Sequence, residues 1–204
     1  GGEKAVTTLP GPVCTARPEP APPPPKPLPP AQSNPLGNVV ARAQWAKEGP
    51  APSLMNKMLP ISYITVHHDG MEPFYATDTG ATAARMEKIR KSHRTKGWGD
   101  IGYHFAVDRN GRVWEGRSLS WQGAHVKDFN EGNIGIVVLG NFDRQSPSPQ
   151  QLAALNALLS KLMRQYGVST GNVKTHQEWP SATACPGTNL QRYMVAVRSN
   201  RQLG

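Results

Sequence analysis

The stretch that decides the fold is Asn133-Ile134-Gly135-Ile136-Val137-Val138-Leu139-Gly140, a nearly unbroken run of apolar, mostly β-branched residues. Such a run is typical of a strand that is buried on both faces, because a strand with one face in water alternates apolar and polar residues. Helices are the elements that cover both faces of such a sheet. The run therefore predicts an α/β fold with a central mixed sheet and helices on both faces.

Two segments supply the main covering helices. Residues 148–167 begin with Ser148 as the N-cap and Pro149 at the first helical position, and they stop at Gly167. Residues 79–96 contain no proline and carry Arg85, Lys88, Lys91, Arg94 and Lys96, which we expect on a solvated helix face. A last short helix is expected over residues 189–198.

A hairpin is expected in the middle of the chain. The β-rich segments 101–107 and 112–115 flank Asn110-Gly111, and Asn-Gly between such segments is the strongest short-range hairpin signal. Tyr103 then lies early in a strand.

Residues 61–68 predict a central strand, because they are rich in β-branched and aromatic residues and are followed by Asp69-Gly70. Successive side chains of a strand point to opposite faces, so only one of His67 and His68 can join a given site. His68 shares the more apolar face, which favours His67 for a polar role.

The chain divides into a tail, residues 1–36, and a single domain, residues 37–204. Twelve of the twenty prolines lie between Pro10 and Pro35. Each proline removes a backbone donor and fixes φ, so we expect the tail to be a disordered, extended spacer. The remainder has the length of one domain with a real core.

The formal net charge of +9 belongs to the domain, since residues 1–36 hold three Lys/Arg against two Asp/Glu. Such a charge suits nucleic acid, an anionic membrane or an anionic cell-wall polymer, and it also suits a merely soluble surface. Nucleic acid is not expected, because no base-stacking platform or recognition motif accompanies the basic residues. No apolar run approaches the roughly 20 residues of a membrane span, and the start lacks the apolar core of a signal peptide.

Two cysteines, Cys14 and Cys185, exclude a disulfide framework. Cys185 follows His176 with eight residues between them, on a segment closed by Pro186-Gly187. An imidazole and a thiolate so placed can bind one metal ion. A buried core histidine and cysteine are the alternative, because both residue types are common in protein interiors.

Several motifs, in this order along the chain, resemble the type 2 amidase and peptidoglycan recognition protein superfamily, which contains zinc-dependent N-acetylmuramoyl-L-alanine amidases. They are residues 64–68 (ITVHH), 97–105 (GWGDIGYHF), 123–125 (GAH), 133–136 (NIGI), 175–176 (TH) and 183–187 (TACPG). Residues 42–45 (RAQW) resemble the entry segment of the recognition-protein branch. The similarity covers roughly residues 39–195.

The resemblance implies a role for eight positions. The zinc (Zn2+) ligands would be His67, His176 and Cys185, the catalytic side groups Tyr103 and Thr183, and the substrate-binding residues His125, Trp98 and Asp100. Three protein ligands leave a fourth position open, which is the pattern of a catalytic zinc and not of a structural one. Thr183 would donate to the tetrahedral oxyanion, and Tyr103 would orient the attacking water and pass a proton to the leaving amine.

The implied function is hydrolysis of the amide between N-acetylmuramic acid and L-alanine in peptidoglycan, by a monomer in the periplasm, the cell envelope or outside the cell. The main alternative is a recognition module that binds peptidoglycan without cutting it. Such modules usually lack the cysteine ligand, so Cys185 favours hydrolysis. Gln177 stands where many members have arginine, which leaves the stem-peptide preference open.

Overall fold

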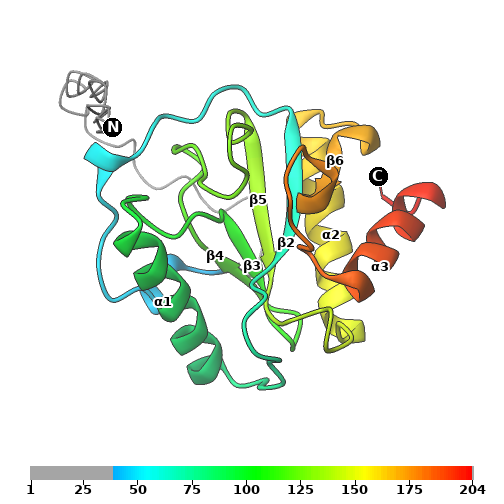
Figure 1. The fold of residues 1–204 in the computed structure, drawn as a ribbon, viewed down its shortest axis with the longest axis horizontal. Helices are drawn as coiled ribbons and strands as arrows, with labels where there is room; N and C mark the ends of the chain where they lie inside the picture. Colours follow the sequence, from blue (N-terminus) through cyan, green and yellow to red (C-terminus); the bar gives the residue numbers. More distant parts are fainter. Residues whose placement is uncertain (1–38, 204) are drawn as a thin grey trace, which may run out of the picture.

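The protein folds around a six-stranded mixed sheet with the strand order β1-β4-β3-β5-β2-β6 (Figure 1). The structure, a computed structural model, describes residues 39–203; the predicted tail and Cys14 lie outside this range. Strands β3, β5, β2 and β6 run parallel to one another, whereas β4 is antiparallel to β3 and parallel to β1. The strands are β1 Val39–Val40, β2 Tyr63–His68, β3 Phe105–Val107, β4 Val113–Glu115, β5 Asn133–Val138 and β6 Val173–Thr175.

Helices cover both faces of the sheet. Figure 1 shows α1 (Thr79–Thr95) on one side and α2 (Pro149–Tyr166) with α3 (Thr188–Ser199) on the other. Every residue of β5 is buried, as expected for a strand between two helical layers. The predicted α/β fold is therefore confirmed. Four short 3-10 helices complete the described chain: η1 Arg42–Gln44, η2 Pro52–Leu54, η3 Thr170–Asn172 and η4 His176–Glu178.

The alternation of side chains along the central strands separates two hydrophobic cores. Ile64 and Val66 of β2 join Ile136 of β5 in the core beneath α2 and α3. Val137 of β5 packs instead into the core beneath α1. Because His67 lies opposite Val137 in the sheet register, its side chain is on the α1 face, as the period of two predicts.

Helix α2 begins and ends where the sequence predicts. The Ser148 hydroxyl accepts a hydrogen bond from Gln151 N at 3.0 Å, and the Gln151 side chain bonds back to Ser148 N. Gly167 ends the helix with φ +67°, in the left-handed region that glycine adopts without steric cost. No helix within residues 39–203 is both long and apolar enough to cross a membrane.

The predicted strand over residues 101–107 is shorter than expected, because β3 begins only at Phe105. The backbone of Gly102 is engaged elsewhere: its N–H donates to His93 Nδ1 and its carbonyl accepts from Ala124 N. A Cβ at this position would lie 2.1 Å from the Ala124 oxygen. Tyr103 therefore precedes the strand and does not lie within it.

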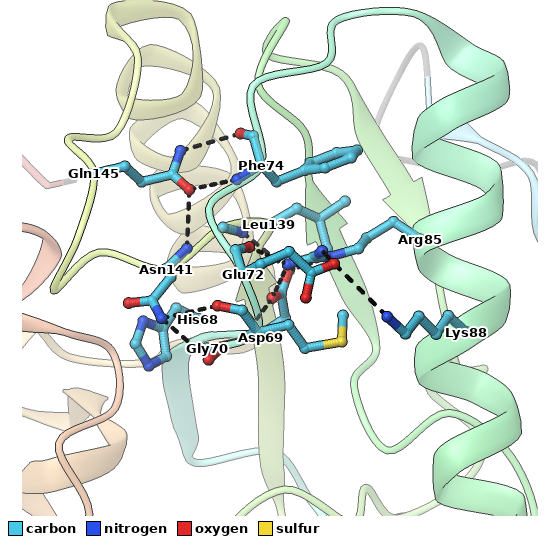
Figure 2. A network of polar contacts seen from close by, with 12 residues as sticks. His68, Asp69, Gly70, Glu72, Phe74, Arg85, Lys88, Leu139, Asn141 and Gln145 are labelled. Carbon is cyan, nitrogen blue, oxygen red and sulfur yellow. Dashed lines mark hydrogen bonds and ion pairs between the residues drawn. The ribbon is translucent and has the colours of Figure 1, made fainter.

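The prediction that Arg85 is solvated is wrong. Arg85 is 5% exposed, and its guanidinium pairs with Asp69 at 2.6 Å and Glu72 at 2.8 Å (Figure 2). Asp69 follows β2 directly, and its carboxylate also accepts from Gly140 N, just beyond β5. This buried pair ties the ends of two central strands to α1.

Candidate metal centre

The parallel pairing of β2 with β6 brings two histidines to one edge of the sheet. Val66 lies opposite Thr175, so the next residue of each segment, His67 within β2 and His176 just after β6, lies beside the other. Their ring centroids are 4.7 Å apart. The carboxyl ends of parallel strands are where α/β proteins most often place their sites.

Cys185 reaches the same edge on the loop that follows η4. Gln177 N donates to the Cys185 carbonyl at 2.9 Å, and Gly187 N donates to the Ala184 carbonyl at 2.7 Å across a turn with a cis Cys185–Pro186 peptide. Gly187 has φ +85°, and a Cβ there would lie 2.6 Å from the backbone of Phe142. Only glycine fits at this position. The end of the loop that carries Cys185 can therefore pack directly against the backbone at Phe142.

The three side chains fit a zinc ion. One ligand atom from each of His67, His176 and Cys185 lies within 4.8 Å of the others, and His67 Nδ1 is 3.6 Å from Cys185 Sγ. Zinc bonds to nitrogen and sulfur at the tetrahedral angle separate these two atoms by about 3.6 Å. Within residues 39–203, no second cluster of three His, Cys, Asp or Glu side chains meets this geometry.

Burial sets the protonation of the three candidate ligands. Burial, followed by the neighbouring His125 and His176, lowers the pKa of His67 well below its ordinary value, and burial also lowers the pKa of His176. Both imidazoles are therefore neutral at pH 7. Burial raises the pKa of the Cys185 thiol to about 12, so the metal-free thiol keeps its proton. Metal binding displaces that proton, as at any thiolate site.

Two further candidates from the sequence lie beside this cluster. The ring of Tyr103 is 5.1 Å from that of His67, centroid to centroid. Burial raises the pKa of Tyr103 well above its ordinary value, so its phenol stays protonated. Thr183 is partly exposed, and its hydroxyl oxygen accepts from Cys185 N at 3.1 Å. That bond fixes the threonine side chain next to the candidate ligand Cys185.

His125 lies behind His67 and not on an open surface. It is 7% exposed. Its Nδ1 is 2.9 Å from His67 Nε2, and its Nε2 is 3.0 Å from the Asn133 carbonyl oxygen. Both ring nitrogens are thus engaged by the protein.

Trp98 and Asp100 differ in what they present. Asp100 is 1% exposed, and its carboxylate binds Arg42 through two hydrogen bonds of 2.8 and 3.1 Å. A direct contact with substrate would require this pair to open. Trp98 is partly exposed, and its ring packs on His93 at 4.6 Å and beneath the ammonium group of Lys96.

Glu178, which none of the sequence motifs singled out, anchors the segment that carries His176. The Glu178 carboxylate accepts from Thr175 N at 2.9 Å and pairs with Arg198 of α3 at 2.5 Å. Thr175 and Glu178 form a capping box around η4. Their spacing of three residues is a sequence signal for such a box.

The fold and the cluster define an α/β protein with three candidate metal ligands at the carboxyl edge of its sheet. The chain belongs to the N-acetylmuramoyl-L-alanine amidase family (Amidase_2), whose model matches residues 57–188.

Its relatives include recognition proteins and amidases. Peptidoglycan-recognition protein SC1a of Drosophila melanogaster is 31% identical over 153 residues, which cover 74% of this chain and 81% of the relative. The structure of bumblebee PGRP-SA has a TM-score of 0.69 at 29% identity and covers 77% of this chain and 93% of that one. The N-acetylmuramoyl-L-alanine amidase LysC of Clostridium intestinale has a TM-score of 0.63 at 26% identity, with 79% and 97% covered.

Proposed function

We propose that this protein is a zinc-dependent N-acetylmuramoyl-L-alanine amidase, which cleaves the amide between N-acetylmuramic acid and the L-alanine of the stem peptide. The observation that carries the proposal is the convergence of His67, His176 and Cys185, whose ligand atoms lie within 4.8 Å of one another. Three protein ligands leave a coordination position open, as in catalytic zinc sites.

His67, His176 and Cys185 would hold a zinc ion, and that ion would supply Lewis acidity toward the scissile carbonyl and the attacking water. Tyr103 acts as a neutral hydrogen-bond donor, since the pKa of its phenol is raised by burial. It orients the attacking water and donates to the leaving amine. Thr183, fixed beside Cys185, donates to the oxyanion. A donor so placed lowers a barrier by about 3 kcal/mol.

The family and the charge of the chain support the proposed substrate class. The family is that of N-acetylmuramoyl-L-alanine amidases, and the net charge of +9 suits an anionic wall polymer. Trp98 is proposed as a substrate contact through the exposed part of its ring. The protein would act as a monomer in the periplasm, the cell envelope or outside the cell, where peptidoglycan lies.

The second candidate function is a recognition module that binds peptidoglycan without cutting it. Similarity to several peptidoglycan-recognition proteins favours this second function. The complete ligand set of His67, His176 and Cys185 favours hydrolysis, because binding alone needs no metal ligand.

Digestion of purified peptidoglycan, with and without a chelator, tests the proposal. New L-alanine amino termini should form in the digest without chelator and should not form in the digest with chelator. Cys185→Ala should abolish them while circular dichroism stays unchanged, and Ser181→Ala, an exposed position in the same loop, should leave them unchanged. Reducing sugar ends would indicate a glycosidase, and wall binding without new amino termini would indicate the recognition module.

A further inference from the structure

A line of hydrogen-bonding groups runs behind the candidate ligand His67. It starts at the backbone carbonyl of Asn133, 3.0 Å from His125 Nε2. His125 Nδ1 follows, 2.9 Å from His67 Nε2. On the far side of the His67 ring, Nδ1 faces Cys185 Sγ at 3.6 Å. Asn133, His125 and His67 are all buried.

The direction of these hydrogen bonds is fixed by the carbonyl at the start of the line. A carbonyl oxygen only accepts, so His125 Nε2 must carry its hydrogen. A metal ion bound at His67 Nδ1 needs the lone pair of that nitrogen, so the hydrogen of the His67 ring lies on Nε2, 2.9 Å from His125 Nδ1. His67 Nε2 must then be the donor, which leaves the lone pair of His67 Nδ1 directed at the cysteine sulfur.

We propose that His125 is a positioning residue, which holds His67 in the tautomer and ring orientation that present Nδ1 to a metal ion. This inference rests on the proposed zinc site. Ligand histidines commonly donate their second N–H to a protein acceptor, which fixes the ring. Here the acceptor is a neutral imidazole, so no second negative charge is placed near the Cys185 sulfur.

Two glycines make room for the His125 ring. A Cβ at Gly135 of β5 would lie 2.6 Å from His125 Cδ2, and a Cβ at Gly123 would lie 2.5 Å from the same atom. Contacts this short force the ring to move. A glycine inside a strand often marks a close approach of this kind. Gly123 and Gly135 both leave space for the His125 ring, and Gly123 also leaves space for His104, whose Cε1 would lie 2.9 Å from the added Cβ.

His104 supports the same arrangement from the other side. Its Nδ1 accepts from Gly135 N at 3.0 Å, and its Nε2 is 3.0 Å from the Trp121 carbonyl. The His104 and His125 rings lie edge to face with centroids 6.0 Å apart. A buried ring with both nitrogens engaged cannot turn toward a substrate without breaking its bonds to Asn133 and His67. His125 therefore acts on His67 through the hydrogen bond between the two rings.

Two substitutions of His125 separate positioning from packing. In His125→Asn the amide oxygen takes the place of Nδ1 and still accepts from His67, whereas His125→Leu keeps bulk and removes the acceptor. Zinc affinity is measured by competition with a chromophoric chelator, and the His67 tautomer by 15N NMR of the metal-free ring. We expect His125→Leu to bind zinc about 10 to 100 times more weakly and to gain the Nδ1–H tautomer of His67. His125→Asn should retain most of the affinity and the Nε2–H tautomer.

A second pair of variants keeps the test decisive if His125→Leu does not fold. Gly135→Ala should displace the ring and weaken zinc binding, while Gly171→Ala, where no atom lies within 4 Å of the new Cβ, should change nothing. The inference is overturned if folded His125→Leu or Gly135→Ala binds zinc as the wild type does and keeps the Nε2–H tautomer. If the variants behave as expected but the wild type with zinc releases no L-alanine amino termini, the positioning role stands and the proposed function fails.

Discussion

At the scale of single residues, burial decides what the side chains beside the candidate metal ligands can do. Tyr103 lies against His67, and burial raises the pKa of its phenol well above the ordinary value of about 10. A phenol that stays protonated can donate a hydrogen bond but cannot act as a base at neutral pH. The proposed role of Tyr103 is therefore that of a donor.

Replacing Tyr103 by phenylalanine removes only this donor. We expect kcat to fall by about 100-fold to 10,000-fold, the range for one general acid or base, with zinc affinity unchanged. The ratio of wild-type to variant rates should stay constant from about pH 6 to 9, because a phenol whose pKa is raised above the ordinary value of about 10 keeps its proton over that range. Rates of L-alanine amino-terminus release at several pH values check this, and a ratio that falls steadily as pH rises would contradict it.

At the scale of elements, the position of His176 depends on contacts between η4 and α3. Burial acts to raise the pKa of Glu178, but hydrogen bonds from Arg198, Thr175 N and Gln191 outweigh it and lower the pKa to about 2. The carboxylate is thus more stable in the folded protein than in the unfolded chain. Its charge links the segment that carries the candidate ligand His176 to the last helix.

Glu178→Gln should lower the free energy of unfolding by about 1 to 3 kcal/mol at pH 7, because each unit of pKa shift is worth about 1.4 kcal/mol. A folded-state pKa below the unfolded value stabilises the protein above the unfolded pKa. The difference between wild type and variant should therefore shrink as pH falls from about 4.5 toward about 2. Urea unfolding in the presence of chelator measures it, with the exposed Glu131→Gln as control. A difference that does not depend on pH would exclude the carboxylate as its source.

At the scale of the whole molecule, net charge governs how the protein meets a large polyanion. The chain carries 23 Lys and Arg against 14 Asp and Glu. Some of these cations are paired inside the fold, as Arg85 and Arg90 are. The exposed remainder, including Lys91 of α1 and Lys127, is available for long-range attraction.

Binding to insoluble, anionic cell wall should therefore weaken several-fold when salt is raised from about 0.05 to 0.2 M, since the screening length falls to about 8 Å near 0.15 M. Cleavage of a small soluble muropeptide should change little, because its binding depends on short-range contacts. Pull-down with wall fragments and turnover of the soluble fragment, measured across the same salt series, check both halves. Equal salt dependence of the two would contradict a role for net charge.

Much of the fold was predictable because its signals are local. Ser148, Pro149 and Gly167 mark the ends of α2 through bonds within a few residues, and the apolar run of β5 shows burial on both faces without reference to any partner. The alternation of His67 and His68 likewise follows from strand geometry. The start of β3 was not predictable, because the backbone of Gly102 bonds to His93 of α1 and to Ala124, outside the strand's own sequence.

By itself, the sequence determined the layered α/β fold, the ends of its main helices and the face on which His67 lies, because these depend on neighbouring residues and on strand and helix periods. Only the tertiary structure decided that Arg85 is buried against Asp69 and that His125 stands behind His67. It also decided that Cys185, 118 positions from His67, lies 3.6 Å from it. Such contacts join distant parts of the chain, and no local pattern specifies which groups will meet.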